Sequence, residues 1–280
     1  HWGYRRGYQS RKKNINLVLG TGIHEALEAY YIGKMPSVNE MIDPVPIFEE
    51  WADAEIEKMD AKWTDEIQAL EDARELGVHM LQGYVEYAEA NDDFVVLETE
   101  QTISRAIPDP MTGEDSPYLF VARLDGIVRD NRTGKIFSLE HKTLSRFDAN
   151  WLERDNQMTA QVWLGQSVMS ELDLPHDEKI VGVIYNGLRK QKPSSRTKAP
   201  LYERHKVYRT QHEIDVLMHR AYNLADTFNN DPAIYPSPQA MACSWCDFRA
   251  PCLEYARGGG YQQLLNELFT SREERYAAQS

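Results

Sequence analysis

Apolar residues at helical spacing predict that the first third of the chain is mostly helical. After Gly20-Thr21-Gly22, apolar side chains recur at intervals of three and four residues as far as Tyr31, which predicts a helix over residues 20–32. Three prolines within residues 33–46 predict a connecting loop. Residues 47–90 contain no proline and are rich in Glu, Ala, Trp, Met and Leu, so we expect two or three helices there.

The pattern then changes to short apolar runs bounded by turns, which predicts three consecutive strands. They cover residues 94–107, 118–128 and 135–141. Prolines and a glycine within 108–113 predict the first turn, and Asn131-Arg132-Thr133-Gly134 predicts a hairpin-like second turn. These three segments should form a meander of strands.

The rest of the chain mixes helices and strands. We expect helices at 150–171, 211–229 and 260–275, strands at 179–188 and 203–209, and a compact loop-rich segment at 231–252. This order predicts an α/β fold with a mixed, mainly antiparallel central sheet flanked by helices. We interpret residues 1–280 as one domain, with a helical insertion at 33–93 and a cysteine-bearing C-terminal segment at 231–280.

Composition excludes several classes of protein. The 280 residues are 42% hydrophobic and 27% charged, which is typical of a globular chain. No apolar stretch approaches the roughly 20 residues that a membrane-spanning helix needs. Three cysteines are too few for a disulfide scaffold, and no secretory signal precedes the body, so we expect a cytoplasmic protein. The chain begins at His1 rather than Met, so we also expect that its true start is missing.

The net charge of −13 argues against a nucleic-acid ligand, but the local distribution of charge argues for one. Residues 1–13 carry five cations and no acid, interleaved with Trp2, Tyr4 and Tyr8, and residues 189–206 carry seven cations against one acid. Both segments predict a path for DNA, with phosphate contacts and aromatic stacking, although a solvated surface also explains much of this charge. The candidate DNA-binding residues are Arg5, Arg6, Lys190, Lys192 and Arg196.

The most informative stretch is residues 118–143. Asp125 interrupts one apolar strand, Glu140 ends the next, and Lys142 follows on the same face two residues later. A hairpin between these strands would bring Asp125 close to Glu140. Two converging carboxylates with a lysine beside them suit Mg²⁺ and the hydrolysis of a phosphate ester. A surface hairpin with an exposed Glu–Lys pair is the alternative for an isolated E-x-K.

This signal is not isolated, and the whole set of motifs resembles the PD-(D/E)XK nuclease superfamily. The set comprises Gly20 to Glu28 on the first helix, Arg-Leu-Asp-Gly-Ile-Val around Asp125, the E-x-K strand, and Gln157-Met-Thr-Ala-Gln161 on a helix. It looks most like the RecB-type branch, which includes phage nucleases and CRISPR-associated adaptation exonucleases. The resemblance implies a restriction-endonuclease-like core.

The resemblance also implies a role for each matching residue. The implied ligands of a Mg²⁺ or Mn²⁺ ion are the side chains of His24, Asp125 and Glu140 and the backbone carbonyl of His141. Lys142 matches the catalytic lysine, and Gln157 matches a glutamine that helps hold the lysine or the DNA. The sequence departs from the family pattern at Ala122-Arg123, where a glycine often precedes the aspartate, and at Gln161, where a tyrosine is usual.

The cysteines Cys243, Cys246 and Cys252 predict a second metal site. A C-x-x-C pair can bind zinc or an iron–sulfur cluster, and His212 or His219 offers a fourth ligand for zinc. Three unliganded thiols are the remaining alternative. The resemblance implies a 4Fe–4S cluster instead, because many RecB-type nucleases hold one with three C-terminal cysteines and one N-terminal cysteine. The fourth cysteine would then lie upstream of His1, and the cluster would join the two chain ends structurally.

The motifs together predict a metal-dependent deoxyribonuclease. The resemblance implies an exonuclease that acts on single-stranded or unwound DNA ends in a bacterial or phage-infected cell. The alternative is a non-catalytic DNA-end-binding or interaction module that retains the nuclease fold.

Overall fold

The structure is a computed structural model that describes residues 2–3, 6–12, 14–59, 64–172, 174–175, 178–194, 200–230 and 239–271. The chain divides into two compact units, each of which has most of its residue–residue contacts within itself. One contains residues 15–226, and the other contains residues 1–14 together with 227–280. The candidate DNA-binding residues Arg5 and Arg196 lie outside the described residues.

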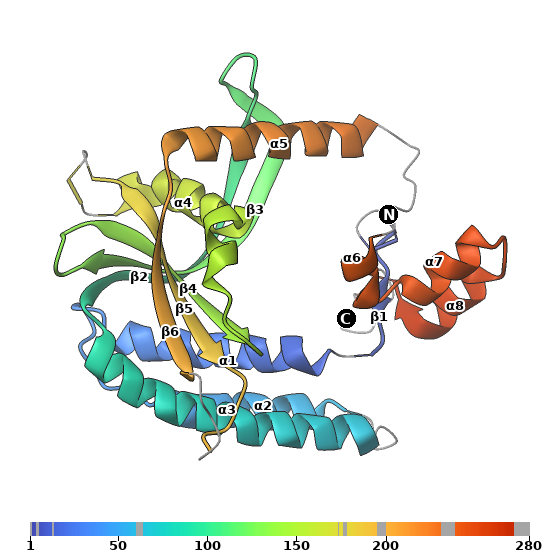
Figure 1. The fold of residues 1–280 in the computed structure, drawn as a ribbon, viewed down its shortest axis with the longest axis horizontal. Coiled ribbons are helices and arrows are strands. Elements are labelled where there is room, and N and C mark those ends of the chain that lie inside the picture. The colour runs from blue at the N-terminus through green and yellow to red at the C-terminus, as the bar shows by residue number, and fades with distance from the viewer. Residues whose placement is uncertain are drawn as a thin grey trace. The chain divides into compact units, whose positions relative to one another are not determined.

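A five-stranded mixed sheet forms the centre of the larger unit (Figure 1). Its strands are β2 (Phe94–Pro108), β3 (Asp115–Asp130), β4 (Ile136–Leu144), β5 (Ile180–Arg189) and β6 (Tyr202–Tyr208), in this spatial order. β4 and β5 are parallel, and the other neighbours are antiparallel. The predicted mixed, mainly antiparallel sheet is confirmed.

The parallel pair requires a crossover, and helix α4 (Asn156–Val168) provides it. The pattern predicted one helix over 150–171, whereas the structure divides this segment into a 3₁₀ turn at Ala149–Arg154, α4, and a second 3₁₀ turn at Met169–Glu171. Asp155 separates the first two because its carboxylate accepts a hydrogen bond from the backbone N–H of Gln157 at 2.8 Å. This cap fixes the start of α4 beside the sheet.

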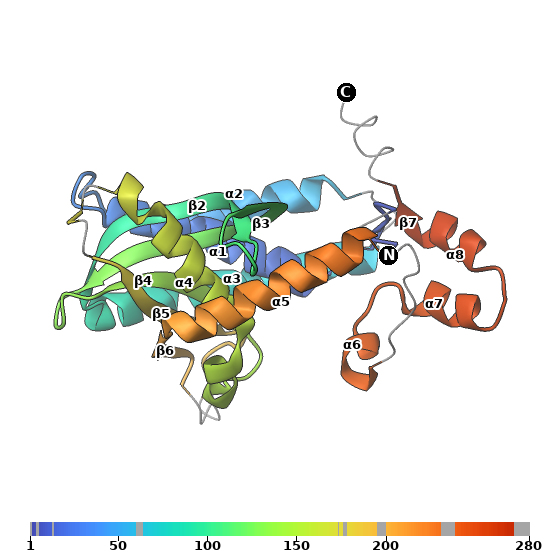
Figure 2. The same ribbon diagram turned by 90° about the horizontal axis from the view of Figure 1, so that it is seen from above.

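Three helices lie on the opposite side of the sheet, two of them against its strands and the third packed on those two (Figure 2). They are α1 (Ile15–Gly33), α2 (Pro44–Glu57) and α3 (Thr64–Asn91). Leu27, Leu81 and Leu139 are buried in one cluster shared by α1, α3 and β4. The segment predicted as a helical insertion therefore packs in the same core as the sheet.

Helix α2 begins earlier than the proline pattern predicted. The loop predicted for 33–46 ends at Asp43, because Pro44 occupies the first turn of a helix, where its missing N–H is not needed. The side chain of Asp43 caps the helix by accepting from the backbone N–H of Val45 at 3.0 Å. The proline was therefore a start signal for a helix rather than part of a loop.

Two glycines let α2 pack closely against its neighbours. A Cβ on Gly22 of α1 would lie 2.3 Å from the ring of Trp51, and one on Gly77 of α3 would lie 2.1 Å from the ring of Phe48. Both aromatic residues belong to α2, so each ring packs into the space that the missing side chain of a glycine leaves on α1 or α3. This packing fixes α1, which carries His24, against the sheet.

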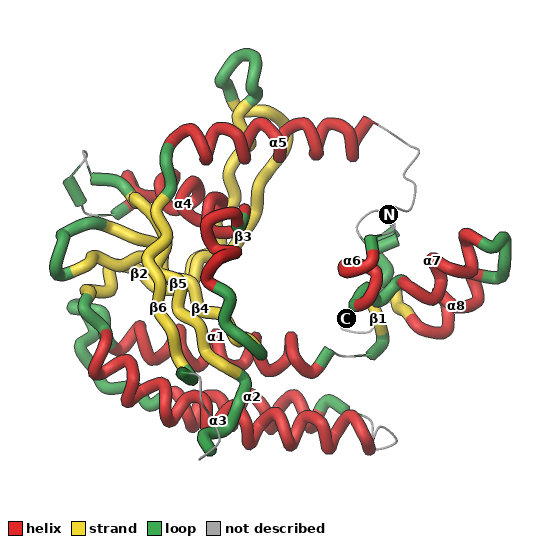
Figure 3. Tube along the Cα trace, in the orientation of Figure 1, coloured by secondary structure: helices red, strands yellow, loops and turns green. Residues whose placement is uncertain are grey.

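The smaller unit joins the two ends of the sequence. Strand β1 (Gln9–Ser10) pairs with β7 (Phe269–Thr270) in an antiparallel ladder. The helices described in this part are α6 (Ala240–Ser244), α7 (Arg249–Ala256) and α8 (Tyr261–Leu268) (Figure 3). The boundary between the units falls within α5 (Gln211–Asn230), after residue 226. The helix predicted over 260–275 ends at Leu268, where β7 begins.

Trp2 is part of an aromatic cluster in this unit. Its ring stacks on Tyr261 with 5.7 Å between centroids and lies 6.0 Å from Phe248 and 6.1 Å from Tyr255. Trp2 therefore contributes to the packing of this unit, and its stacking on DNA stays a prediction. Among the described residues, no helix combines the length and apolar character required to span a bilayer.

Candidate active site

The two predicted carboxylates come together on adjacent strands. The β3–β4 register pairs Gly126 with Leu139, so Asp125 lies beside Glu140. The backbone N–H of His141 donates to Oδ2 of Asp125 at 2.7 Å and fixes that side chain. The Asp125 and Glu140 side chains are only 9% and 2% exposed, so two adjacent acidic groups are buried from solvent. An exposed hairpin pair, the alternative from sequence, does not describe this arrangement.

His24 reaches the same place from α1. Its Nδ1 lies 3.2 Å from Oδ1 of Asp125. Burial opposes protonation of His24, but the hydrogen bond and the charge of Asp125 outweigh it and raise the pKa of His24 above its usual value. Burial likewise opposes ionisation of Asp125, and the contacts with His24 outweigh it and lower the pKa of Asp125.

Glu140 receives three donors from two elements. Nζ of Lys142 lies 2.5 Å from its Oε1, Nε2 of Gln157 donates to Oε1 at 2.7 Å, and Nε2 of Gln161 donates to Oε2. Burial, and after it the neighbouring charge of Asp125, raises the pKa of Glu140. The donors oppose this shift, so they help to keep the carboxylate ionised.

Gln161 is a functional candidate that the sequence reasoning treated only as a departure from a family pattern. It lies four residues after Gln157 on α4, so both amides face Glu140 from the same side of the helix. Its Nε2 binds Glu140, while its buried Oε1 has no hydrogen-bond partner among the described residues. The spacing of four residues between Gln157 and Gln161 was the signal in the sequence from which Gln161 could have been predicted.

A third acid, Glu100, was not predicted. The β2–β3 register pairs Gln101 with Leu124 and Thr99 with Gly126, which places Glu100 opposite Asp125. Glu100 forms an ion pair with Arg123, which belongs to the Ala122-Arg123 departure from the family pattern. Burial and the nearby charge of Glu28 on α1 raise the pKa of Glu100. The acidic surroundings of Asp125 therefore extend onto β2 and α1.

The side chain of His141 points away from these acids into a buried polar network. Nδ2 of Asn186 on β5 lies 2.8 Å from Nδ1 of His141 and 2.7 Å from the hydroxyl of Tyr84. Tyr84 and Tyr31 share a hydrogen bond of 2.6 Å. Arg204 on β6 donates to Oδ1 of Asn186 at 3.2 and 3.3 Å and forms an ion pair with Asp92 at 2.9 Å. Through His141, this network links β4 to β5, β6 and α3 next to the residue that carries the Glu140 carboxylate.

The residues at the site fit a divalent metal ion chemically. Their donors are one imidazole and two carboxylates, with the carbonyl of His141 as the implied fourth, a set typical of hard or borderline divalent cations. The charge of Asp125 raises the pKa of Glu140, and a nearby cation would reduce this repulsion between the two buried carboxylates. In the structure, no three His, Cys, Asp or Glu side chains of the described residues are arranged so that they could bind one metal ion together.

The predicted DNA-binding residues are placed differently from one another. Lys190 follows β5; its backbone N–H donates to Leu144, and its Nζ lies 2.7 Å from Oδ1 of Asn16 at the start of α1. It therefore lies near the end of β4 that carries Lys142. Lys192 instead forms an ion pair of 2.5 Å with Glu75 on α3, and Arg6 is exposed in the smaller unit.

The three cysteines lie in the smaller unit, around α6 and α7. Burial, and then the proximity of Cys243 and Cys246, raises the pKa of the Cys252 thiol. Within the described chain, the three thiols do not stand as a formed metal-binding group. His212 and His219, the alternative zinc ligands, belong to α5 in the larger unit.

A five-stranded mixed sheet flanked by helices, with buried carboxylates and a lysine on two central strands, defines a restriction-endonuclease-like fold. A family model of the PD-(D/E)XK nuclease superfamily matches residues 1–253. The chain therefore belongs to the PD-(D/E)XK nuclease superfamily. The comparison with curated proteins gives no match.

Proposed function

We propose that this protein is a Mg²⁺- or Mn²⁺-dependent deoxyribonuclease whose active site contains His24, Asp125, Glu140 and Lys142. The observation that carries the proposal is the convergence of these four side chains, with Lys142 and Glu140 2.5 Å apart. His24, Asp125, Glu140 and the carbonyl of His141 would hold the ion. When bound, the ion supplies activation of water and neutralisation of phosphate charge.

The chain's own residues prepare this chemistry. Gln157 and Gln161 orient Glu140 and favour its ionised form, and the backbone N–H of His141 does the same for Asp125. Lys142 is one-third exposed, so its ammonium can contact both Glu140 and an approaching phosphate. Positive charge at that position stabilises the additional negative charge that develops as the phosphodiester bond breaks.

We further propose exonuclease action on single-stranded or unwound DNA ends. The resemblance of His24, the E-x-K strand and the Gln157 helix to RecB-type nucleases supports this proposal. Lys190 supports a DNA contact near the active site, because it lies beside Leu144 at the end of β4. The acidic surface elsewhere should make DNA binding strongly dependent on salt.

The test is cleavage of end-labelled single- and double-stranded DNA with Mg²⁺, Mn²⁺ or EDTA. Lys142→Ala should lose cleavage by at least about a hundredfold, since a catalytic charge is removed. Lys135→Ala is the matched control, because Lys135 is an exposed lysine just before the opposite end of the same strand. A ladder of products shortened from one end would support the exonuclease, and internal fragments would contradict it. DNA binding without cleavage in either metal would favour the non-catalytic module.

For the smaller unit, we propose a structural 4Fe–4S cluster bound by Cys243, Cys246 and Cys252. The spacing of the three cysteines around α6 and α7 supports it, and so does the packing of Trp2 against Phe248, which lies between Cys246 and Cys252. The cluster would then strengthen the junction between the chain ends. Anaerobic purification should give a brown protein with about four irons and four sulfides per chain, lost in Cys246→Ser. Zinc without sulfide would overturn the iron–sulfur assignment.

A further inference from the structure

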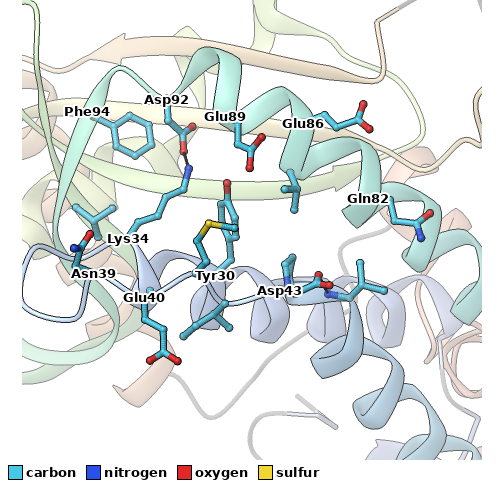
Figure 4. A pocket seen from close by; sticks show the side chains of 17 residues that line it. Tyr30, Lys34, Asn39, Glu40, Asp43, Gln82, Glu86, Glu89, Asp92 and Phe94 are labelled. Atoms are coloured by element: carbon cyan, nitrogen blue, oxygen red, sulfur yellow. Dashed lines mark hydrogen bonds and ion pairs between the residues drawn. The ribbon is translucent and has the colours of Figure 1, made fainter.

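A cavity of about 940 Å³ lies between the end of α1, the segment that leads to α2, and the second half of α3 (Figure 4). No candidate catalytic side chain lines it. Its apolar wall includes Ile42, Val45, Val85 and Phe94. Its volume is in the range of pockets that bind small molecules.

The charge of the lining is strongly negative. Five carboxylates and one ammonium group contribute, from Glu40, Asp43, Glu86, Glu89, Asp92 and Lys34. Lys34 and Asp92 neutralise each other in an ion pair of 2.9 Å, and Asp92 also pairs with Arg204. The remaining four acids are exposed residues from two sides of the cavity. The lining therefore attracts a cation and repels the phosphates of DNA.

Tyr30 gives an independent indication of a ligand. It is 6% exposed, and its buried hydroxyl forms no hydrogen bond of ordinary length with a described residue, although Nζ of Lys34 lies over its ring, 4.5 Å from the centroid. Figure 4 shows its side chain in the middle of the lining, with the hydroxyl directed toward α3 and Glu89. Burial raises the pKa of the Tyr30 phenol, so the group stays neutral and can accept a hydrogen bond. A buried polar group without a partner costs free energy that a ligand would recover.

We propose that this cavity binds an organic cation: a protonated amine or guanidinium group on an aliphatic stem. The stem would contact the apolar wall, and the cation would lie between Glu86 and Glu89 and donate to the hydroxyl of Tyr30. Polyamines and the lysine or arginine side chains of a basic protein share this chemistry. Because no catalytic residue takes part, the inference does not depend on the proposed nuclease activity.

Isothermal titration calorimetry with spermidine, and separately with an unstructured lysine-rich peptide, tests the proposal and distinguishes the two sources. At least one probe should bind with one site per chain. Glu86→Gln/Glu89→Gln should weaken that binding at least about tenfold, because charge-assisted contacts are lost. The matched control is Glu114→Gln/Asp115→Asn, which removes the same charge at the exposed β2–β3 turn and should leave the affinity unchanged.

Tyr30→Phe separates a binding role from a structural one. It should weaken binding about fivefold while leaving the melting temperature unchanged or higher, since it removes a buried hydroxyl without a partner. The proposal is overturned if neither probe binds, or if both double variants weaken binding equally. A lower melting temperature in Tyr30→Phe with unchanged affinity would also overturn the role of the hydroxyl.

Discussion

Asn186 holds His141 in a single tautomer. Arg204 donates to Oδ1 of Asn186, which turns Nδ2 of the amide toward Nδ1 of His141, 2.8 Å away. Because an amide nitrogen can only donate, Nδ1 accepts and the imidazole proton lies on Nε2. Burial lowers the pKa of His141 to about 3, so the ring is neutral at physiological pH. The backbone carbonyl implied as a metal ligand thus belongs to a residue with a fixed side chain.

Replacing Asn186 should therefore destabilise the protein. Asn186→Leu removes one hydrogen-bond partner from each of His141, Tyr84 and Arg204. The polar groups of these buried side chains then lack that hydrogen bond. We expect a loss of about 2–4 kcal/mol in the free energy of unfolding, measured by urea denaturation. Asn150→Leu, at an exposed position, should change it by less than about 0.5 kcal/mol. Similar small losses in both variants would contradict the importance of the network.

The neutral His141 should make stability dependent on pH. Its folded pKa of about 3 lies below the ordinary value of 6.5, so between these values the unfolded chain binds the proton and the folded chain does not. Its contribution to stability is complete above pH 6.5 and falls as the pH decreases toward 3, by at most about 1.4 kcal/mol per pH unit. His141→Gln should reduce this slope in denaturation curves recorded from pH 4 to 7.5. An unchanged slope would show that other groups produce it.

Gln161 should affect the pH dependence of DNA cleavage. It donates to Glu140 and favours the ionised carboxylate, whose pKa burial has already raised. In Gln161→Ala the pKa of Glu140 should rise further, so the acidic limb of the pH–rate profile should move to higher pH. Gln166→Ala is the control, since Gln166 donates to the carbonyl of Ile180 from the same helix. A profile that falls in height without moving would indicate a purely structural role.

Metal affinity should increase with pH because His24 must lose its proton to act as a ligand. Asp125 raises the pKa of His24, so a bound ion competes with a proton that the free site holds tightly. Between pH 6 and 8, the affinity for Mn²⁺ should rise by up to about tenfold per pH unit below that pKa. His24→Ala should bind Mn²⁺ more weakly and with a flatter pH dependence. An equally steep dependence in the variant would exclude His24 as the responsible group.

Local patterns were sufficient to predict the sheet and the pair of carboxylates. Alternation along the strands and a short turn at Asn131–Gly134 fix which residues of β3 and β4 are neighbours, so Asp125 and Glu140 follow from the sequence. The two-residue strands β1 and β7 are too short to show alternation. Pro44 was misread because a proline in a helix's first turn resembles a proline in a loop.

The surroundings of the site depend on contacts between distant elements. Asn186, Arg204 and Tyr84 come from β5, β6 and α3, and no spacing in the sequence relates them. Lys192 was predicted from its basic neighbours to contact DNA; the structure adds an ion pair with Glu75 of α3, which no spacing in the sequence indicates. A charge pattern shows which side chains are available, whereas tertiary packing decides which partner each one meets.

The pairing of β1 with β7 sets an order of events during synthesis on the ribosome. Residues 15–226 contain a complete sheet and its helices, so this unit can assemble its contacts while the rest of the chain is still being made. Gln9 and Ser10 are synthesised before this unit, but their pairing partners Phe269 and Thr270 are synthesised after it. Until then, Trp2 and the cysteine-bearing helices remain separate. The pairing that joins the two segments of the smaller unit can therefore form only after residue 270 has been synthesised, later than every contact within residues 15–226.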